Sequence, residues 1–143
     1  MAIKRILCAV DGSKITGHVA DCAVELAEAT GAKLTFLTVN VVPTRARRTH
    51  YWDAETMNAA AAQASKQVAS AVKSAKAKKF ENYDCVVASG SAVADAIVSY
   101  AAKNKIDHIV MGTNTTNELA RLFLGSVATA VVSHASAPVT IVK

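Results

Sequence analysis

Three glycine–serine pairs stand where an apolar segment gives way to a helical pattern. They are Gly12-Ser13, Gly90-Ser91 and Gly125-Ser126. Glycine allows a tight turn and close approach of the backbone to a ligand, and we expect each serine to cap the helix that follows. A helix N-terminus also presents unpaired N–H groups and a positive dipole end, an arrangement that holds anions such as phosphate. Taken singly, such a pair is more often a plain turn followed by a helix cap.

Asp11 follows directly on the apolar end of residues 3–10. If those residues form a buried strand, the carboxylate lies at the carboxyl end of that strand, where parallel sheets bind their ligands. A carboxylate there can accept hydrogen bonds from ribose hydroxyls. A second interpretation stays open, in which Asp11 only caps the following helix.

The common nucleotide, catalytic and metal motifs are absent. Residues 12–17 have the outer spacing of a Walker A loop, but His18 and Val19 replace the lysine and the hydroxyl residue that this loop requires. There is no G-x-G-x-x-G fingerprint, and the histidines and cysteines show no metal-ligand spacing. We therefore predict no catalytic residues and no metal site built from protein side chains.

Apolar segments alternate with helical patterns along the whole chain. The expected strands cover residues 3–10, 33–42, 83–89, 107–112 and 138–142. The segments between them repeat apolar residues at the spacing of an amphipathic helix. Strands that alternate with helices form a parallel sheet with helices on both faces, joined by right-handed crossovers. We therefore predict one α/β domain over residues 1–143.

Composition and charge exclude several classes of protein. Of the 143 residues, 52% are hydrophobic and 19% are charged, which excludes a disordered chain. A net charge of +5 is too mild to predict a nucleic-acid partner. Residues 122–142 lack charge but contain Pro138 and several polar residues, so they predict a buried helix and strand and no membrane span. Without a signal-peptide pattern, we expect a cytoplasmic protein with buried, reduced thiols at Cys8, Cys22 and Cys85.

Four segments resemble the universal stress proteins of the UspA superfamily. They are Cys8-Ala9-Val10-Asp11-Gly12-Ser13, Met111-Gly112-Thr113, Leu124-Gly125-Ser126-Val127 and Ala137-Pro138-Val139. ATP-binding members of that family carry a G-x2-G-x9-G-[ST] motif between the fourth strand and the last helix. Gly112, Thr115 and Gly125-Ser126 stand in the same frame, with threonine in place of the second glycine. Asn114 takes a position that is often basic in the family.

The resemblance implies an adenine nucleotide alpha hydrolase-like fold, an open parallel sheet with strand order 3-2-1-4-5. It also implies an adenine nucleotide as ligand, either ATP, ADP or AMP, with any Mg²⁺ held by the phosphates and water. By the same resemblance Asp11 faces the ribose, Val39 the adenine, and Gly125-Ser126 the phosphates. The full set of residues placed at the nucleotide is Ala9, Val10, Asp11, Val39, Met111, Gly112, Thr113, Gly125, Ser126 and Val127.

A homodimer through the last strand is a further implication, because many members of the family pair in this way. Val139, Ile141 and Val142 make that strand apolar. An open apolar edge invites pairing with a second copy of the chain.

Three functions are compatible with these features. The first is a dimeric stress-response or signalling module that binds an adenine nucleotide and hydrolyses it slowly at most. The second is a dimeric adaptor of the family's other branch, which binds no nucleotide and acts through protein partners; Thr115 fits that branch. The third is an adenylating or ATP-pyrophosphatase enzyme, but residues 9–14 carry neither its S-G-G-x-D-S loop nor its His-x-Gly-His motif.

Overall fold

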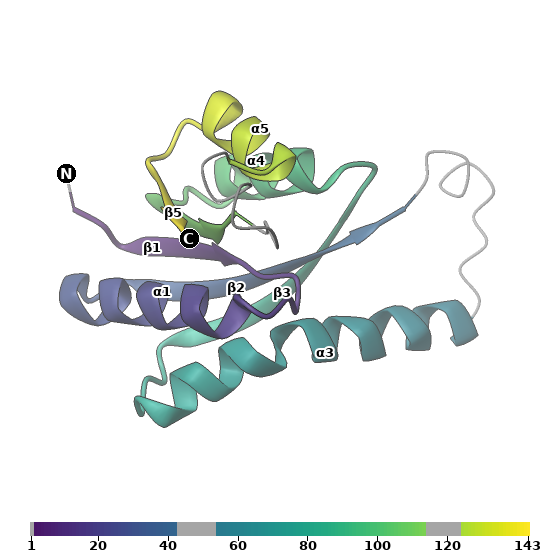
Figure 1. Cartoon of the computed structure of the whole chain (residues 1–143), viewed down its shortest axis with the longest axis horizontal. Coiled ribbons are helices and arrows are strands. Elements are labelled where there is room, and N and C mark those ends of the chain that lie inside the picture. Colours follow the sequence, from purple (N-terminus) through teal and green to yellow (C-terminus); the bar gives the residue numbers. More distant parts are fainter. Residues whose placement is uncertain (1, 43–53, 114–123) are drawn as a thin grey trace.

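The protein is built on a single sheet of five parallel strands in the order β3-β2-β1-β4-β5 (Figure 1). The computed structural model describes residues 2–42, 54–113 and 124–143. Its strands are β1 (Arg5–Ala9), β2 (Lys33–Val41), β3 (Tyr83–Gly90), β4 (His108–Gly112) and β5 (Val139–Val142). All four pairings are parallel. The predicted fold class and strand order are confirmed.

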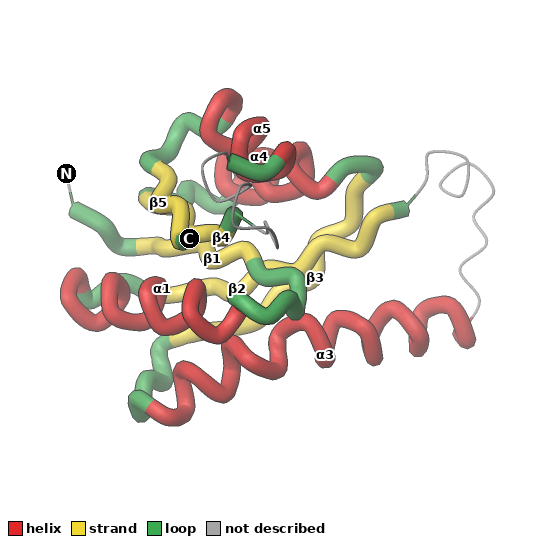
Figure 2. Tube along the Cα trace, in the orientation of Figure 1, coloured by secondary structure: helices red, strands yellow, loops and turns green. Residues whose placement is uncertain are grey.

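Helices cover both faces of the sheet. Those described are α1 (Thr16–Thr30), α3 (Ala54–Ala77), α4 (Val93–Lys103) and α5 (Ser126–His134). Helices α1 and α3 lie on one face, and α4 and α5 lie on the other (Figure 1). Figure 2 shows the same arrangement as red helices above and below the yellow strands. The chain therefore forms the three layers that alternating strands and helices predict.

Helix α1 illustrates how the sequence builds these layers. Its buried side chains are Thr16, Val19, Ala20, Ala23, Val24 and Ala27. Their three- and four-residue spacing puts them on one face, and the alanines allow that face to lie close to the sheet. The helix ends at Gly31, which has a left-handed φ of 72° and donates its N–H to the carbonyl of Ala27.

Two clusters of apolar side chains hold the sheet between its helices. Ile6, Leu34 and Phe36 are fully buried on the α1 and α3 face. Leu7 and Leu37 are fully buried on the α4 and α5 face. Successive residues of a strand point to opposite faces, so the unbroken apolar run of β1 supplies both clusters. Burying one such side chain stabilises the fold by roughly 1.5–3 kcal/mol.

The expectation that all three cysteines are buried is wrong. Cys8 is buried in β1, Cys22 is half-buried, and Cys85 is exposed. The reason is topological: β3 lies at the edge of the sheet, and alternate residues from Cys85 to Ser89 face solvent. Burial raises the pKa of the Cys8 thiol, so this thiol stays protonated at neutral pH.

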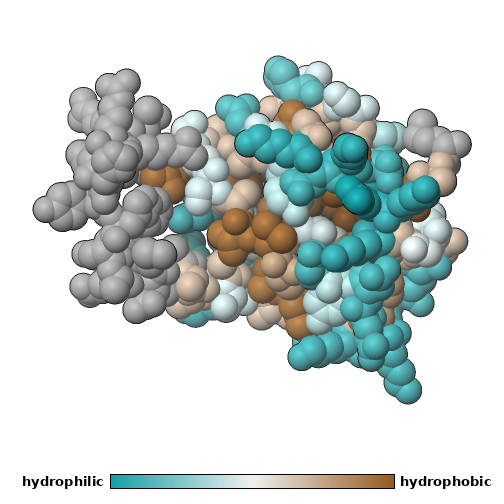
Figure 3. All heavy atoms as spheres, turned by 180° about the vertical axis from the view of Figure 1, so that it is seen from behind, coloured by the Kyte–Doolittle hydropathy of each residue, from teal (hydrophilic) through white to brown (hydrophobic). Residues whose placement is uncertain are grey.

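The surface is chemically mixed. Figure 3 shows hydrophobic and hydrophilic residues side by side on the face opposite to that of Figure 1. Among the helices in the described part of the chain, none combines the length and the hydropathy that a membrane crossing requires.

Candidate functional site

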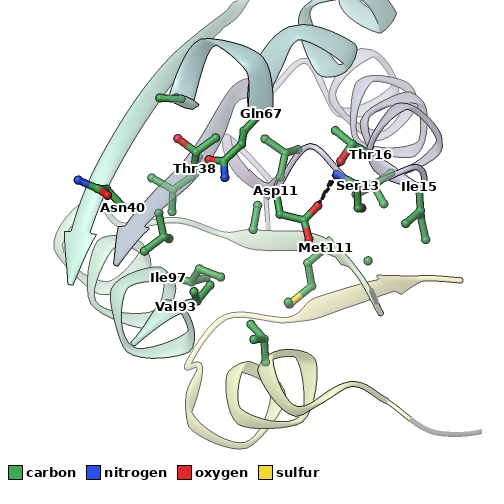
Figure 4. Close-up of a pocket in the computed structure, with 18 of the residues that line it drawn as sticks. Asp11, Ser13, Ile15, Thr16, Thr38, Asn40, Gln67, Val93, Ile97 and Met111 are labelled. Atoms are coloured by element: carbon green, nitrogen blue, oxygen red, sulfur yellow. Dashed lines mark hydrogen bonds between the residues drawn. The ribbon is translucent and has the colours of Figure 1, made fainter. Parts of the chain in front are cut away.

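A cavity of about 430 Å³ lies at the carboxyl ends of β1, β2 and β4 (Figure 4). Its volume falls within the range of small-molecule sites, roughly 300–1,000 Å³. The helix that follows β1 covers one face of the sheet, and the helix that follows β4 covers the other. Neighbouring parallel strands whose connections leave on opposite faces define a switch point, the usual ligand position in open α/β sheets.

Eight of the ten residues predicted to contact a ligand line this cavity. They are Ala9, Val10, Asp11, Val39, Met111, Gly112, Thr113 and Val127. Gly125 and Ser126 are not lining residues; they immediately precede Val127 in the chain. Asn114 and Thr115 lie outside the described residues. The fold thus gathers the predicted residues around one space, and their contact with a nucleotide stays a prediction.

Asp11 organises the turn between β1 and α1. Its Oδ1 accepts hydrogen bonds from the Ser13 N–H at 2.9 Å and from the Thr16 hydroxyl at 3.3 Å (Figure 4). The N-cap of α1 is Ile15, so the interpretation of Asp11 as a helix cap is wrong. Within the described part of the chain Oδ2 has no hydrogen-bond donor, so it can accept one from a ligand.

The expectation that the three serines cap their helices is also wrong. The N-cap residues of α1, α4 and α5 are Ile15, Ala92 and Gly125, and none is accompanied by a side-chain cap. The first two helices begin later than the glycine–serine pairs suggest, while Ser126 is already the first residue of α5. The first N–H groups of α5 therefore have no side-chain acceptor at the cap position.

One wall of the cavity is apolar, and it lies on the α4 and α5 face of the sheet. This apolar wall consists of Val39, Val93, Ile97, Met111 and Val127. Its members come from β2, α4, β4 and α5. A surface of aliphatic side chains with few polar groups suits the flat face of an aromatic ring.

The wall on the α3 face of the sheet is polar. This polar wall consists of Thr38 from β2 and of Gln63 and Gln67 from α3. Sequence reasoning missed all three residues. A signal was present, because Gln63 and Gln67 are spaced one helical turn apart in an alanine-rich helix and so share a face.

Charge is scarce around the cavity. Asp11 is the only ionisable side chain among the described residues that line it. No group of three His, Cys, Asp or Glu side chains in the described ranges is placed to hold a metal ion. An anionic group bound here would meet backbone N–H groups and hydroxyls, together with the N-terminal end of α5.

Two motif glycines are required by packing at this end of the sheet. A Cβ added at Gly125 would overlap the carbonyl oxygen of Thr113. A Cβ added at Gly112 would lie 3.0 Å from Cγ2 of Val19 and 3.4 Å from Cδ1 of Ile15. Both glycines let β4 and the start of α5 lie close to their neighbours. Part of the motif spacing therefore has a structural cause that needs no ligand.

The sheet and its cavity define a doubly wound α/β domain with a ligand-sized space at the switch point. More particularly, the chain belongs to the universal stress protein family, whose sequence profile matches residues 2–143. The match covers every strand and helix described above.

Individual relatives agree with this assignment. A universal stress protein of Methanocaldococcus jannaschii is 50% identical over 50 residues, a match that covers 35% of this chain and 29% of the relative. A Staphylococcus haemolyticus protein with the same family name is 28% identical over 144 residues, covering 100% of this chain and 86% of the relative. Among solved structures, a universal stress protein in complex with cAMP has a TM-score of 0.77 and 25% identity. The superposition covers 100% of this chain and 99% of that one.

Proposed function

We propose that the chain is a cytoplasmic stress-response or signalling module that binds AMP, ADP or ATP in the cavity at the switch point. The observation that carries the proposal is the pairing of an apolar wall with a carboxylate that has one oxygen available, both at the carboxyl ends of the central strands. An adenine nucleoside needs this pair of features, an apolar surface for the base and an acceptor for the ribose hydroxyls.

Each part of the nucleotide has a position in this proposal. The adenine ring lies against Val39 and Met111 of the apolar wall, and the ribose hydroxyls donate to Asp11. The phosphates lie at the N-terminus of α5, beside Thr113 and Val127, where the helix dipole and N–H groups favour negative charge. Mg²⁺, when present, is held by phosphate oxygens and water because the lining offers a single carboxylate.

The comparison with the cAMP complex supports the same ligand class. That protein is 25% identical to this chain over its full length and binds an adenine nucleotide. Its ligand has a single phosphate, which agrees with a cavity whose described lining carries no cation.

Calorimetry and thermal shift with AMP, ADP and ATP, each with and without Mg²⁺, test the proposal. Ligand at 100 times its Kd adds about 2.7 kcal/mol to the free energy of unfolding, a readily measured shift. Val39→Asp buries a charge in the apolar wall and should abolish binding. Val132→Asp is the matched control, because Val132 is 46% exposed on α5 and does not line the cavity. Equal binding by both variants would contradict the proposed position of the base.

A second function, the adaptor that binds no nucleotide, is favoured by one observation. Among the described residues, the only charged side chain of the cavity is the carboxylate of Asp11, which repels phosphates. If none of the three nucleotides shifts the melting temperature at millimolar concentration, the adaptor function replaces the first.

We also propose that the protein is a homodimer joined through β5. In the described structure β5 is an edge strand that pairs only with β4. Ile109 and Thr113 donate to the carbonyls of Pro138 and Val142, so by the parallel ladder pattern Val139 and Ile141 direct their N–H and C=O groups outward. The side chains of β5 serve the chain's own core, since Val142 is buried and Val139 packs on the α4 and α5 cluster. Backbone pairing would therefore join the two subunits.

Light scattering at a protein concentration of tens of micromolar distinguishes a monomer from a dimer, since a dimer has twice the 14.9 kDa mass of the chain. Val139→Pro removes one outward N–H and should give a monomer, because proline cannot donate to a strand ladder. Val139→Thr keeps the N–H and the branched shape and should remain dimeric. A wild-type protein that is monomeric under these conditions would contradict the dimer.

A further inference from the structure

Strand β3 forms the edge of the sheet opposite to β5. In the described part of the chain it pairs only with β2, in parallel. The N–H of Val42 donates to the carbonyl of Gly90, so by the parallel ladder pattern every second residue back from Gly90 directs its backbone groups at β2. The backbone N–H and C=O groups of Cys85 and Val87 therefore point outward, where no described residue bonds them.

The sequence of β3 does not protect this edge. The strand is 8 residues long and contains neither lysine nor proline, the residues that commonly block edge pairing. Its charged residue, Asp84, lies 3.5 Å from Lys33 of the neighbouring strand β2 and forms an ion pair with it. Cys85 is exposed, and Val87 is 52% exposed. An open apolar edge of this length can accept a further strand.

The packing of α3 leaves this face of β3 open. Helix α3 lies on β2 and beside α1 (Figure 1). The Ser74 hydroxyl donates to the carbonyl of Gly17 in α1 at 3.2 Å. Lys78 Nζ lies 3.1 Å from Glu25 Oε1 of the same helix. These contacts turn one flank of α3 toward α1, so the opposite flank faces the β3 side of the sheet.

That opposite flank carries a shallow groove with an apolar floor and a cationic rim. Val68 and Val72 are half-buried in it, and the exposed side chains of Lys73 and Lys76 border it. Neither lysine forms an ion pair with a described residue. Because α3 ends at Ala77, shortly before β3 begins, both lysines lie toward the start of β3. The groove therefore offers apolar contact along its floor and positive charge at one end.

We propose that β3 and the groove of α3 form a docking surface for an extended acidic segment of a protein partner, which adds to the sheet as a further strand. The outward backbone groups of Cys85 and Val87 bond the segment's backbone, and its branched apolar side chains cover Val87. Its carboxylates lie at Lys73 and Lys76. A second copy of the chain fits this surface less well, because each copy carries a net charge of +5 and would add its own lysines to the interface. This inference does not rest on nucleotide binding.

Fluorescence polarisation with two labelled octapeptides tests the surface. The acidic probe is Thr-Val-Thr-Val-Thr-Glu-Glu-Glu, and the basic probe has lysines in place of the glutamates. The wild type should bind the acidic probe about fivefold tighter than the basic probe, because the rim of the groove is cationic. Equal affinities for the two probes would overturn the proposal.

The backbone contact is tested at Cys85, which does not line the nucleotide cavity, whereas Val87 does. Cys85→Pro removes one outward N–H and should weaken binding of the acidic probe about tenfold. Cys85→Val is the matched control, because it keeps the N–H and should bind the probe within about twofold of the wild type. Thermal melting shows whether each variant is folded. A folded Cys85→Pro variant with wild-type affinity would rule out strand addition at β3.

The charge contact is tested separately, so the proposal can fail even if Cys85→Pro does not fold. Lys76→Glu should weaken binding of the acidic probe about fivefold and strengthen binding of the basic probe. Lys103→Glu is the matched control, because Lys103 is also an exposed lysine in the last turn of a helix but belongs to α4 on the other face of the sheet. If both variants weaken the acidic probe equally, only net charge matters and the groove is not the site.

The alternative occupant, a second copy of the chain, has its own signature. Light scattering of the protein without peptide should give the same mass for the wild type and for Cys85→Pro. A lower mass for the variant would show that β3 joins two copies of this chain, and the acidic partner would be wrong.

Discussion

The two helical layers of this protein differ in how completely they enclose the sheet. On the α1 and α3 face, Leu34, Phe36 and Val24 are fully buried. On the α4 and α5 face, Leu37 and Ile109 are buried as deeply, but Val39, Val93 and Val127 are only half-buried where they reach the cavity. Half-buried aliphatic side chains at a cavity gain most when a ligand covers them. The second layer therefore divides its apolar surface between stability and the candidate site, while the first layer supplies the polar wall of the same cavity.

The largest expected effect compares Phe36→Ala with Val39→Ala, two truncations in the same strand that point to different layers. Phe36 is fully buried, so its truncation should lower the free energy of unfolding by about 3–5 kcal/mol. Val39 is half-buried, so its truncation should have a much smaller effect on stability and should weaken AMP binding. Urea denaturation and calorimetry measure the two quantities. Similar losses of stability in both variants would remove the distinction between the layers.

Gly125→Ala and Gly31→Ala compare two glycines that are needed for different reasons. Gly125 has an ordinary φ of −65°, but an added Cβ would overlap the Thr113 carbonyl and force α5 away from β4. We expect a loss of about 1–3 kcal/mol in stability, as in other overpacked sites, together with weaker nucleotide binding. Gly31 has a left-handed φ and open space around it, so alanine should cost about 1–2 kcal/mol and leave binding unchanged. Unaltered binding by Gly125→Ala would show that α5 takes no part in the site.

Asp11→Ala tests the carboxylate that lies between the two walls. Loss of hydrogen bonds to a charged acceptor, worth about 1.5–3 kcal/mol, should weaken AMP binding by roughly tenfold or more. The affinity for 2′,3′-dideoxy-AMP should be nearly the same in the wild type and the variant, because that analogue has no ribose hydroxyl to lose. If both ligands weaken equally, Asp11 acts by holding the turn through Ser13 and Thr16 and does not bind the ribose.

The smallest effect concerns Asp107, a carboxylate at the opposite end of the sheet from Asp11. Backbone N–H groups of Lys4 and Arg5 donate to its Oδ2 at 2.9 and 3.0 Å, and these bonds lower the pKa of Asp107. A lowered folded-state pKa gives stability that is complete above the unfolded pKa of about 3.9 and is lost as pH falls through the folded value. Asp107→Asn should flatten the decline of stability below pH 5 and leave nucleotide binding unchanged. If the wild type and Asp107→Asn lose stability identically as the pH falls, the hydrogen bonds to Asp107 do not contribute to acid stability as proposed.

Much of the fold could be predicted from the sequence because patterns within short segments determine it. Alternation of apolar strands with amphipathic helices predicts a parallel sheet, and the glycine after α1 predicts where that helix ends. The position of Asp11 at the end of the first strand likewise predicted that it lies at a ligand site, and the resemblance to the family added Ala9 and Met111. The strand order came from the resemblance to the family.

Other features were decided only by tertiary structure. Helix caps were misassigned because glycine–serine pairs specify a turn and leave open how many residues pass before the helix begins, as Ile15 and Ala92 show. Cys85 was expected inside because an apolar run does not reveal that its strand lies at an edge. The polar wall was missed because Thr38 and Gln67 belong to different elements, and only the packing of α3 on β2 places both at one cavity. The spacing of a motif is a property of one segment, whereas a wall built across two segments exists only after the layers have packed.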